Sequence, residues 1–123
     1  MSTVFSEPIY LGDLLKFEED NRYSRDLITV AAGQNLPLGT VLAMANGQAV
    51  AFNPNATDGS ETVVGVLLDD VDATLAATES IMVSRNALLS DRYVVWPAGI
   101  TSQQQAAATA ALNALGVVIR TGA

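Results

Sequence analysis

The densest group of residues that could carry out chemistry is the acidic run Asp69-Asp70-Val71-Asp72. Three carboxylates at this spacing could form a calcium site or a general acid–base pair. The calcium loop of an EF-hand also needs a glycine at its sixth position and a glutamate at its twelfth, and this stretch has neither. A run of charges after an apolar strand is more commonly a solvated loop, and we interpret it so.

Nucleophilic and redox chemistry is restricted by the absence of both histidine and cysteine from the chain. This removes imidazole catalysis, cysteine nucleophiles, disulfides and the usual zinc sites. Lys16 is the single lysine, and the adjacent Glu18 and Glu19 favour its charged form, whereas a nucleophilic lysine needs the neutral form. The glycines are spaced singly, without a phosphate-binding pattern. We therefore expect no enzymatic activity, no metal and no cofactor.

The charge balance narrows the class of partner. Thirteen acidic residues against six basic ones give a net charge of −7. Nucleic-acid binding normally needs a basic stripe that displaces counterions from phosphates, so we expect no direct contact with DNA or RNA. The longest apolar stretch, 106–119, is interrupted by polar residues and is too short to cross a bilayer. Residues 1–8 lack the features of a signal peptide, so we expect a soluble protein that stays where it is made, without a membrane partner.

Most of the chain has the pattern of short β-strands separated by turns. Asn46-Gly47, between two apolar segments, is a strong signal for a type I′ hairpin. The polar segment 53–62 predicts a loop. The expected strands are 27–31, 40–44, 48–52, 63–68, 81–85 and 93–96.

One segment near the end of the chain predicts a helix. Thr101 and Gln104 form a capping-box pattern, and Gly116 suits the C-terminal end. One buried helical face is expected to contain Ala108, Ala111, Leu112 and Leu115. Residues 117–119 then return to a strand. The predicted fold is therefore a mainly β (α+β) domain with one C-terminal helix.

The first 26 residues differ from the rest because no turn pairs them with a neighbouring strand. Exposed leucine and phenylalanine side chains on such a segment are a liability unless they dock on a partner. We therefore divide the chain into an N-terminal arm, residues 1–26, and a β-rich body, residues 27–123. The candidate anchors on the arm are Val4, Phe5, Ile9, Tyr10, Leu11, Leu14 and Leu15.

The chain resembles the lambda-type phage head decoration family along nearly its whole length after residue 10. The order and spacing of several blocks carry this resemblance, rather than any single motif. In the first half these are Leu14-Leu15-Lys16-Phe17-Glu18-Glu19, Arg22-Tyr23-Ser24-Arg25, Thr29-Val30-Ala31-Ala32-Gly33-Gln34 and Leu38-Gly39-Thr40-Val41-Leu42. In the second half they are Val50-Ala51-Phe52, Asp58-Gly59, Val64-Gly65-Val66-Leu67, Val94-Val95-Trp96-Pro97 and Gly116-Val117-Val118-Ile119-Arg120.

The resemblance implies a β-clip-like ribbon fold whose homotrimers bind the major capsid protein. They would sit at three-fold and quasi-three-fold positions on the outer surface of the expanded head of the virion, after synthesis in the bacterial host cytoplasm. They would stabilise the head against the pressure of packaged DNA, the arm supplying the capsid contact. The family's arm is rich in Ser, Thr and Pro, whereas this one carries Leu, Phe and the block 22–25, so its contact should differ in detail. Candidate trimer contacts are Arg85, Arg92 and Trp96. For Trp96, packing in the core of the subunit is an equally good interpretation.

Two other functional classes compete with this interpretation. A free-standing phage binding module, tail or adhesin-like, could recognise glycans, but such sites are usually lined by aromatic rings. Only seven aromatic residues are present in the chain, and a glycan screen would separate the two classes. A β-clip enzyme such as a nucleotide hydrolase is disfavoured because histidine is absent and no metal-ligand pattern is evident.

Overall fold

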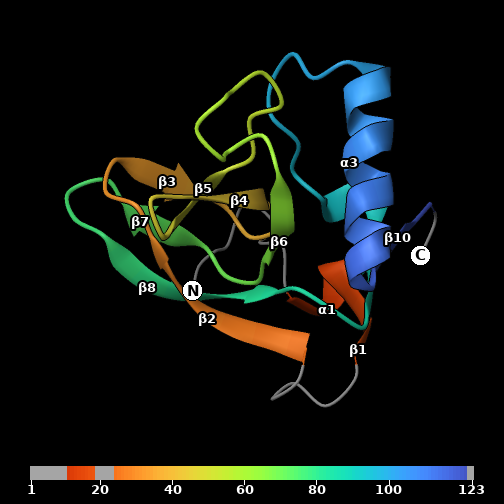
Figure 1. Cartoon of the computed structure of the whole chain (residues 1–123). Helices are drawn as coiled ribbons and strands as arrows, with labels where there is room; N and C mark the ends of the chain where they lie inside the picture. The colour runs from red at the N-terminus through yellow and green to blue at the C-terminus, as the bar shows by residue number, and fades with distance from the viewer. Residues whose placement is uncertain (1–10, 19–23, 122–123) are drawn as a thin grey trace, which may run out of the picture.

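The computed structural model describes residues 11–18 and 24–121, and its centre is a small closed barrel (Figure 1). Five strands form the barrel in the order β2-β5-β4-β6-β8. They are β2 (Arg25–Val30), β4 (Val41–Ala45), β5 (Gln48–Ala51), β6 (Val63–Leu67) and β8 (Thr78–Val83). The mainly β class with one long C-terminal helix is confirmed. No helix within the described ranges is long and apolar enough to span a membrane.

The hairpin between β4 and β5 confirms the Asn46-Gly47 prediction. The two residues have φ values of 54° and 78°, and a type I′ turn requires positive φ at both central positions. The strands pair in antiparallel register from Ala45 and Gln48 at the turn to Leu42 and Ala51. The turn therefore sets the register that directs Leu42 and Ala49 into the barrel interior.

Two smaller sheets flank the barrel. The first contains β1 (Leu15–Glu18), β9 (Ala87–Ser90) and β10 (Val117–Arg120) in the order β1-β9-β10. Strand β1 runs antiparallel to β9, whereas β10 runs parallel to it. The second sheet pairs β3 (Gln34–Leu36) with β7 (Val71–Ala73). Neither β7 nor β9 was expected from the sequence.

The prediction of a strand at 93–96 is wrong. Asp91–Tyr93 form a 3-10 helix, η1, and Val95 makes only an isolated bridge with Thr40. The Val95 N–H donates to the Gly39 carbonyl at 2.8 Å, and the Val41 N–H donates to the Val95 carbonyl at 3.2 Å. The segment thus contacts the beginning of β4 at one residue, and Pro97, which has no N–H, follows two residues later.

Helix α3 (Ser102–Leu115) begins and ends as the sequence predicts, but its buried face is narrower. The Gln104 N–H donates to Thr101 Oγ1 at 3.0 Å, and the Thr101 N–H donates to Gln104 Oε1 at 3.1 Å, completing the capping box. Gly116 closes the helix with φ 99°. Ala108 and Leu112 are buried, whereas Ala111 is exposed and Leu115 is 44% exposed. The helix rests on the body along a single i, i+4 line, so the flanking positions stay open.

Part of the segment that the sequence assigns to the arm lies against the body in α1 and β1. Leu14, in the short helix α1 (Leu11–Leu14), is fully buried in a core shared with Leu89, Leu112 and Val117. Strand β1 pairs with β9, and β2 of the barrel begins at Arg25. The sequence showed no partner for this segment because β9, about 70 residues later in the chain, was itself not predicted. A second core of Ile28, Val30, Leu42, Leu67 and Met82 fills the barrel.

Candidate docking surface

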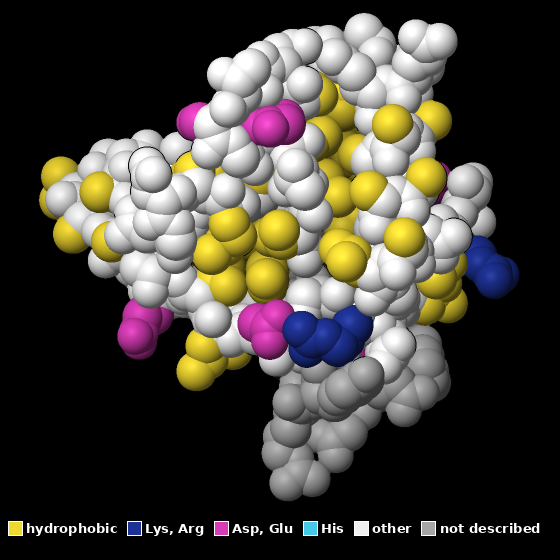
Figure 2. Space-filling view, viewed as in Figure 1, with side chains coloured by type: hydrophobic (Ala, Val, Ile, Leu, Met, Phe, Trp, Pro, Cys, Tyr) yellow, Lys and Arg dark blue, Asp and Glu magenta, His cyan; other side chains and the backbone are white. Residues whose placement is uncertain are grey.

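An apolar groove opens on one face of the body, between the barrel strands and the C-terminal end of α3. Its volume is about 720 Å³. Figure 2 shows hydrophobic side chains gathered over this region, with an acidic and a basic group in contact below them. Leu27 is 85% exposed beside the groove because β2 alternates its side chains and directs Ile28 and Val30 inward. The apolar lining comes from Leu27, Ile28, Met44, Val63, Val64, Met82 and Leu115. We call this surface the apolar face.

A charged pair forms one rim of the apolar face. Arg85 Nη2 donates to Asp26 Oδ2 at 2.9 Å, and the Ser84 hydroxyl donates to the same oxygen at 2.6 Å. The Ser84 hydrogen bond, followed by the Arg85 guanidinium, holds the pKa of Asp26 below its ordinary value. The rim therefore carries a neutralised ion pair with a defined geometry. A polar rim around an apolar centre is the usual arrangement of protein–protein interfaces.

A second charged cluster joins β1 to β2. Arg25 Nε donates to Glu18 Oε2 at 2.7 Å, and Arg25 Nη2 donates to Glu18 Oε1 at 2.8 Å, so the pair is bidentate. The buried Ser24 hydroxyl also donates to Glu18 Oε2. These contacts, with Arg25 the larger, lower the pKa of Glu18, and the carboxylate raises the pKa of Arg25. The cluster holds residues 11–18 on the barrel and is a structural link.

The acidic run Asp69, Asp70 and Asp72 is exposed and hydrogen-bonded locally. Asp70 Oδ1 accepts from the Leu38 N–H at 2.7 Å, and Asp72 accepts from both the N–H and the hydroxyl of Thr74. The carboxylates thus accept hydrogen bonds that stabilise the turns before and after β7. Within the part of the chain that the structure describes, no three acidic, histidine or cysteine side chains gather closely enough to hold a metal ion.

The predicted arm anchors fall into two groups. Val4, Phe5, Ile9 and Tyr10 lie outside the described residues. Leu11 and Leu15 are half-buried against the core, and the Leu14 side chain is fully inside it. The Leu14 side chain therefore serves the core of the body in this fold.

The three candidate trimer contacts lie on different surfaces. Arg85 is on the rim of the apolar face. Arg92 is exposed, with its guanidinium 5.7 Å from the centroid of the Tyr93 ring, and Trp96 is half-buried against the core. Neither of these two lines the apolar face. The sequence interpretation missed Leu27, although the alternation in Leu27-Ile28-Thr29-Val30 was available, because the run is apolar at three of its four positions.

Comparison with known proteins places these features in a family. A comparison with individual curated proteins gave no significant match. The family model for bacteriophage lambda head decoration protein D matches residues 4–117, nearly the whole chain, including the barrel, the β3–β7 sheet, β1, β9 and α3, and it ends at the first residue of β10. Decoration proteins of this family bind the phage capsid and are structural rather than catalytic. The chain therefore belongs to the bacteriophage lambda head decoration protein D family, the structural proteins that decorate and stabilise the phage capsid.

Proposed function

We propose that this protein binds as homotrimers to the outer surface of the expanded head, at three-fold and quasi-three-fold positions. There it stabilises the shell of major capsid protein against the pressure of packaged DNA. The match to the decoration family over residues 4–117 carries this proposal. The exposed apolar face and the N-terminal residues supply the two kinds of contact that the proposal requires, one between copies and one with the shell.

The apolar face is our candidate for the contact between copies. A contiguous apolar surface is unusual on a monomer whose net charge is −7 and signals an interface. In a cyclic trimer each subunit presents this face to a different surface of the next subunit, so the contact need not be self-complementary. Arg85 and Asp26 would form part of its polar rim. Arg92 and Trp96 remain candidates for the opposing surface.

The residues before the body are our candidate for the shell contact. Val4, Phe5, Ile9 and Tyr10 would dock as an extended segment that adds a strand to a sheet edge of the shell protein. Leu11, Leu14 and Leu15 hold the base of this segment to the body. Three such segments on one trimer would raise the apparent affinity by roughly 10²–10⁴-fold through effective concentration.

Deletion of residues 1–10 tests this proposal because it leaves Leu14 and β1 in place. We expect the shortened protein to keep its solution mass and thermal stability but to lose binding to expanded shells, measured by co-sedimentation. The control is the full chain carrying Leu75→Ala, an exposed position in the loop between β7 and β8. Wild-type occupancy by the shortened protein would show that the shell contact lies elsewhere.

A further inference from the structure

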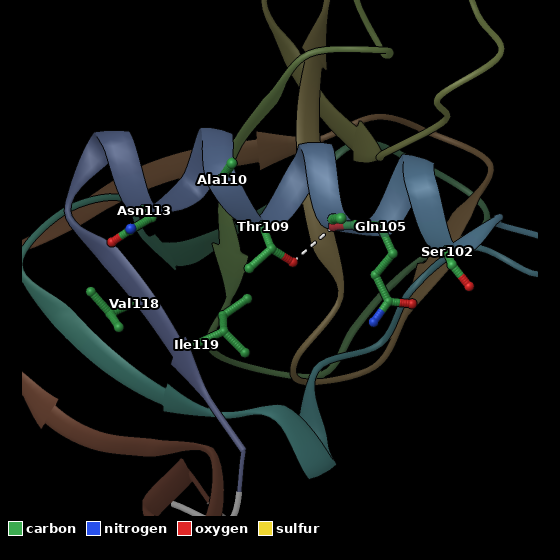
Figure 3. Close-up of a pocket in the computed structure, with 8 residues that line it drawn as sticks. Ser102, Gln105, Thr109, Ala110, Asn113, Val118 and Ile119 are labelled. Atoms are coloured by element: carbon green, nitrogen blue, oxygen red, sulfur yellow. Dashed lines mark hydrogen bonds between the residues drawn. The ribbon is translucent and has the colours of Figure 1, made fainter.

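A second groove, separate from the apolar face, lies between α3 and β10. Its volume is about 490 Å³. Figure 3 shows Gln105, Thr109 and Asn113 projecting from one side of the helix toward Val118 and Ile119 of β10. The Thr109 hydroxyl donates to the Gln105 carbonyl at 2.8 Å, so its hydrogen-bonding need is met within the helix. Ser102, Ala106 and Ala110 complete the lining with small side chains. We call this site the α3–β10 groove.

The β10 backbone offers hydrogen-bonding groups on the side away from β9. Strand β10 is an edge strand of its sheet, in parallel register with β9 from Val117 opposite Ala87 to Arg120 opposite Ser90. The Ala87 N–H donates to the Gly116 carbonyl at 3.0 Å. In a parallel ladder, this hydrogen bond means that the backbone N–H and C=O groups of residues 118 and 120 point toward β9. The backbone N–H and C=O groups of Ile119 therefore point away from β9. Among the described strands, β9 alone pairs with β10. A sheet edge of this kind is a template for another strand.

We propose that the α3–β10 groove receives an extended segment of the capsid shell protein, which pairs with Ile119 and places an acidic side chain against Arg120. The groove combines an edge for main-chain pairing with the amides of Gln105 and Asn113 for side-chain hydrogen bonds, and Ala106 leaves space for the incoming chain. Arg120 is exposed at the end of β10 and is a local positive charge on an acidic protein. It favours a partner segment that is acidic at that end.

The position of Leu11, where the described chain begins, favours the shell as the source of this segment. The described chain starts at Leu11, in α1, which packs against η1 and β9. Figure 1 shows α1, β1 and β10 on the same side of the molecule. The described chain therefore begins beside the three-stranded sheet that has β10 at one edge. This step rests on the proposed function: if residues 1–10 bind the shell, the shell surface lies beside the α3–β10 groove.

The matched pair Ala106→Trp and Ala114→Trp tests the proposal. Both alanines are exposed on α3, but Ala106 lines the groove and Ala114 does not. We expect Ala106→Trp to weaken binding to expanded shells by about tenfold or more, because the indole ring would occupy the space that the incoming chain needs, a loss as large as that of an important interface contact. Ala114→Trp should bind within about twofold of the wild type because its tryptophan lies outside the contact. Thermal unfolding of both variants checks that each is folded.

Two further measurements address the chemistry of the groove. Hydrogen–deuterium exchange of the Ile119 amide should slow when the wild-type protein binds shells, since that N–H gains an acceptor. Arg120→Glu should weaken shell binding, whereas Arg120→Lys should retain most of it. Unchanged exchange at Ile119 in the bound state would overturn strand pairing at this edge.

The outcomes separate this inference from the proposed function. If Ala106→Trp binds shells like the wild type while deletion of residues 1–10 abolishes binding, the proposed function stands and the groove inference falls. If the wild-type protein does not bind expanded shells, both fall. If Ala106→Trp instead changes the solution mass and the Ile119 amide is already protected in the free protein, the groove is a contact between copies, which overturns the inference.

Discussion

At the residue scale, the charged side chains of the body hold segments together rather than act on a substrate. The Glu18–Arg25 pair joins β1 to β2, and the Asp26–Arg85 pair joins β2 to the end of β8. Both carboxylates accept an additional serine hydroxyl, from Ser24 and Ser84 respectively. Charge-assisted bonds of this kind contribute most when they are bidentate and partly shielded from water.

Replacement of Glu18 by glutamine should reduce stability in a pH-dependent manner. The folded pKa of Glu18 is lowered from 4.5, mainly by Arg25, so its contribution is present above that value and is lost as pH falls through the folded pKa. We expect Glu18→Gln to cost about 1–2 kcal/mol at pH 7 and progressively less below pH 4.5. Urea unfolding at several pH values measures this.

The comparison variant for this prediction is Asp26→Asn. The Asp26 side chain is 40% exposed, against 12% for Glu18, so its charge is better screened by water. Its pKa is also lowered, so the sign of its pH dependence is the same and the size should be smaller. A stability difference between wild type and Glu18→Gln that stays constant from pH 7 to about pH 3 would contradict the assignment.

Leu14 tests whether residues 11–18 belong to the body. The side chain is fully buried, so Leu14→Ala should lower the free energy of unfolding by about 2–5 kcal/mol, measured by chemical denaturation. Leu75→Ala is the matched control because that leucine is 97% exposed, and it should change stability by less than about 0.5 kcal/mol. Equal small effects of the two substitutions would mean that Leu14 belongs to the arm and does not contribute to the core of the body.

At the element scale, one close approach connects the barrel to the segment after η1. Gly39 has φ 94°, and a Cβ at this position would lie 2.1 Å from the Tyr93 carbonyl oxygen. The Gly39 carbonyl also accepts from the Val95 N–H. The chain at Gly39 therefore needs glycine for two reasons, its left-handed backbone and the absence of space.

Gly39→Ala and Gly33→Ala separate these two reasons. Gly33 has a similar φ of 93°, but nothing lies within 4 Å of the position that a Cβ would take there, so alanine should cost about 1–2 kcal/mol from the backbone alone. Gly39→Ala should cost roughly 3 kcal/mol or more, because the clash with Tyr93 adds to the same backbone cost. Thermal and urea unfolding measure the difference, and equal losses would mean that the 93–95 segment moves aside freely.

At the scale of the whole molecule, the apolar face favours association between copies, whereas the net charge opposes it. Like charges on separate copies repel, but salt screens exposed charges over about 8 Å at physiological ionic strength. Burial of the apolar side chains around Leu27 then favours association. The proposed trimer should therefore be stabilised by added salt, in contrast to an interface held together mainly by ion pairs.

Leu27→Glu should dissociate the proposed trimer because it places a charge on the apolar face of every copy. Light scattering over a concentration series should show a trimer for the wild type and for Leu75→Glu, and a monomer for Leu27→Glu. If the wild-type protein stays monomeric at every concentration, trimers can form only on the shell. This result would also favour a free-standing binding module, for which a glycan screen is the next measurement.

The sequence by itself determined the features that depend on neighbours in the chain. The Asn46-Gly47 turn, the capping box of Thr101 and Gln104, and the end of α3 at Gly116 each follow from a few adjacent residues. The mainly β class follows in the same way. The order of blocks along the chain also indicated the decoration family.

The tertiary structure decided the features that depend on residues far apart in the chain. Ala87–Ser90 becomes a strand because β1 and β10 pair with it from either side, and this same pairing places residues 11–18 on the body. Leu115 stays exposed because α3 crosses the body along one line, and both grooves arise where such elements meet without filling the space between them. Periodicity shows which side chains share one face of an element, whereas only the packed chain determines what covers that face.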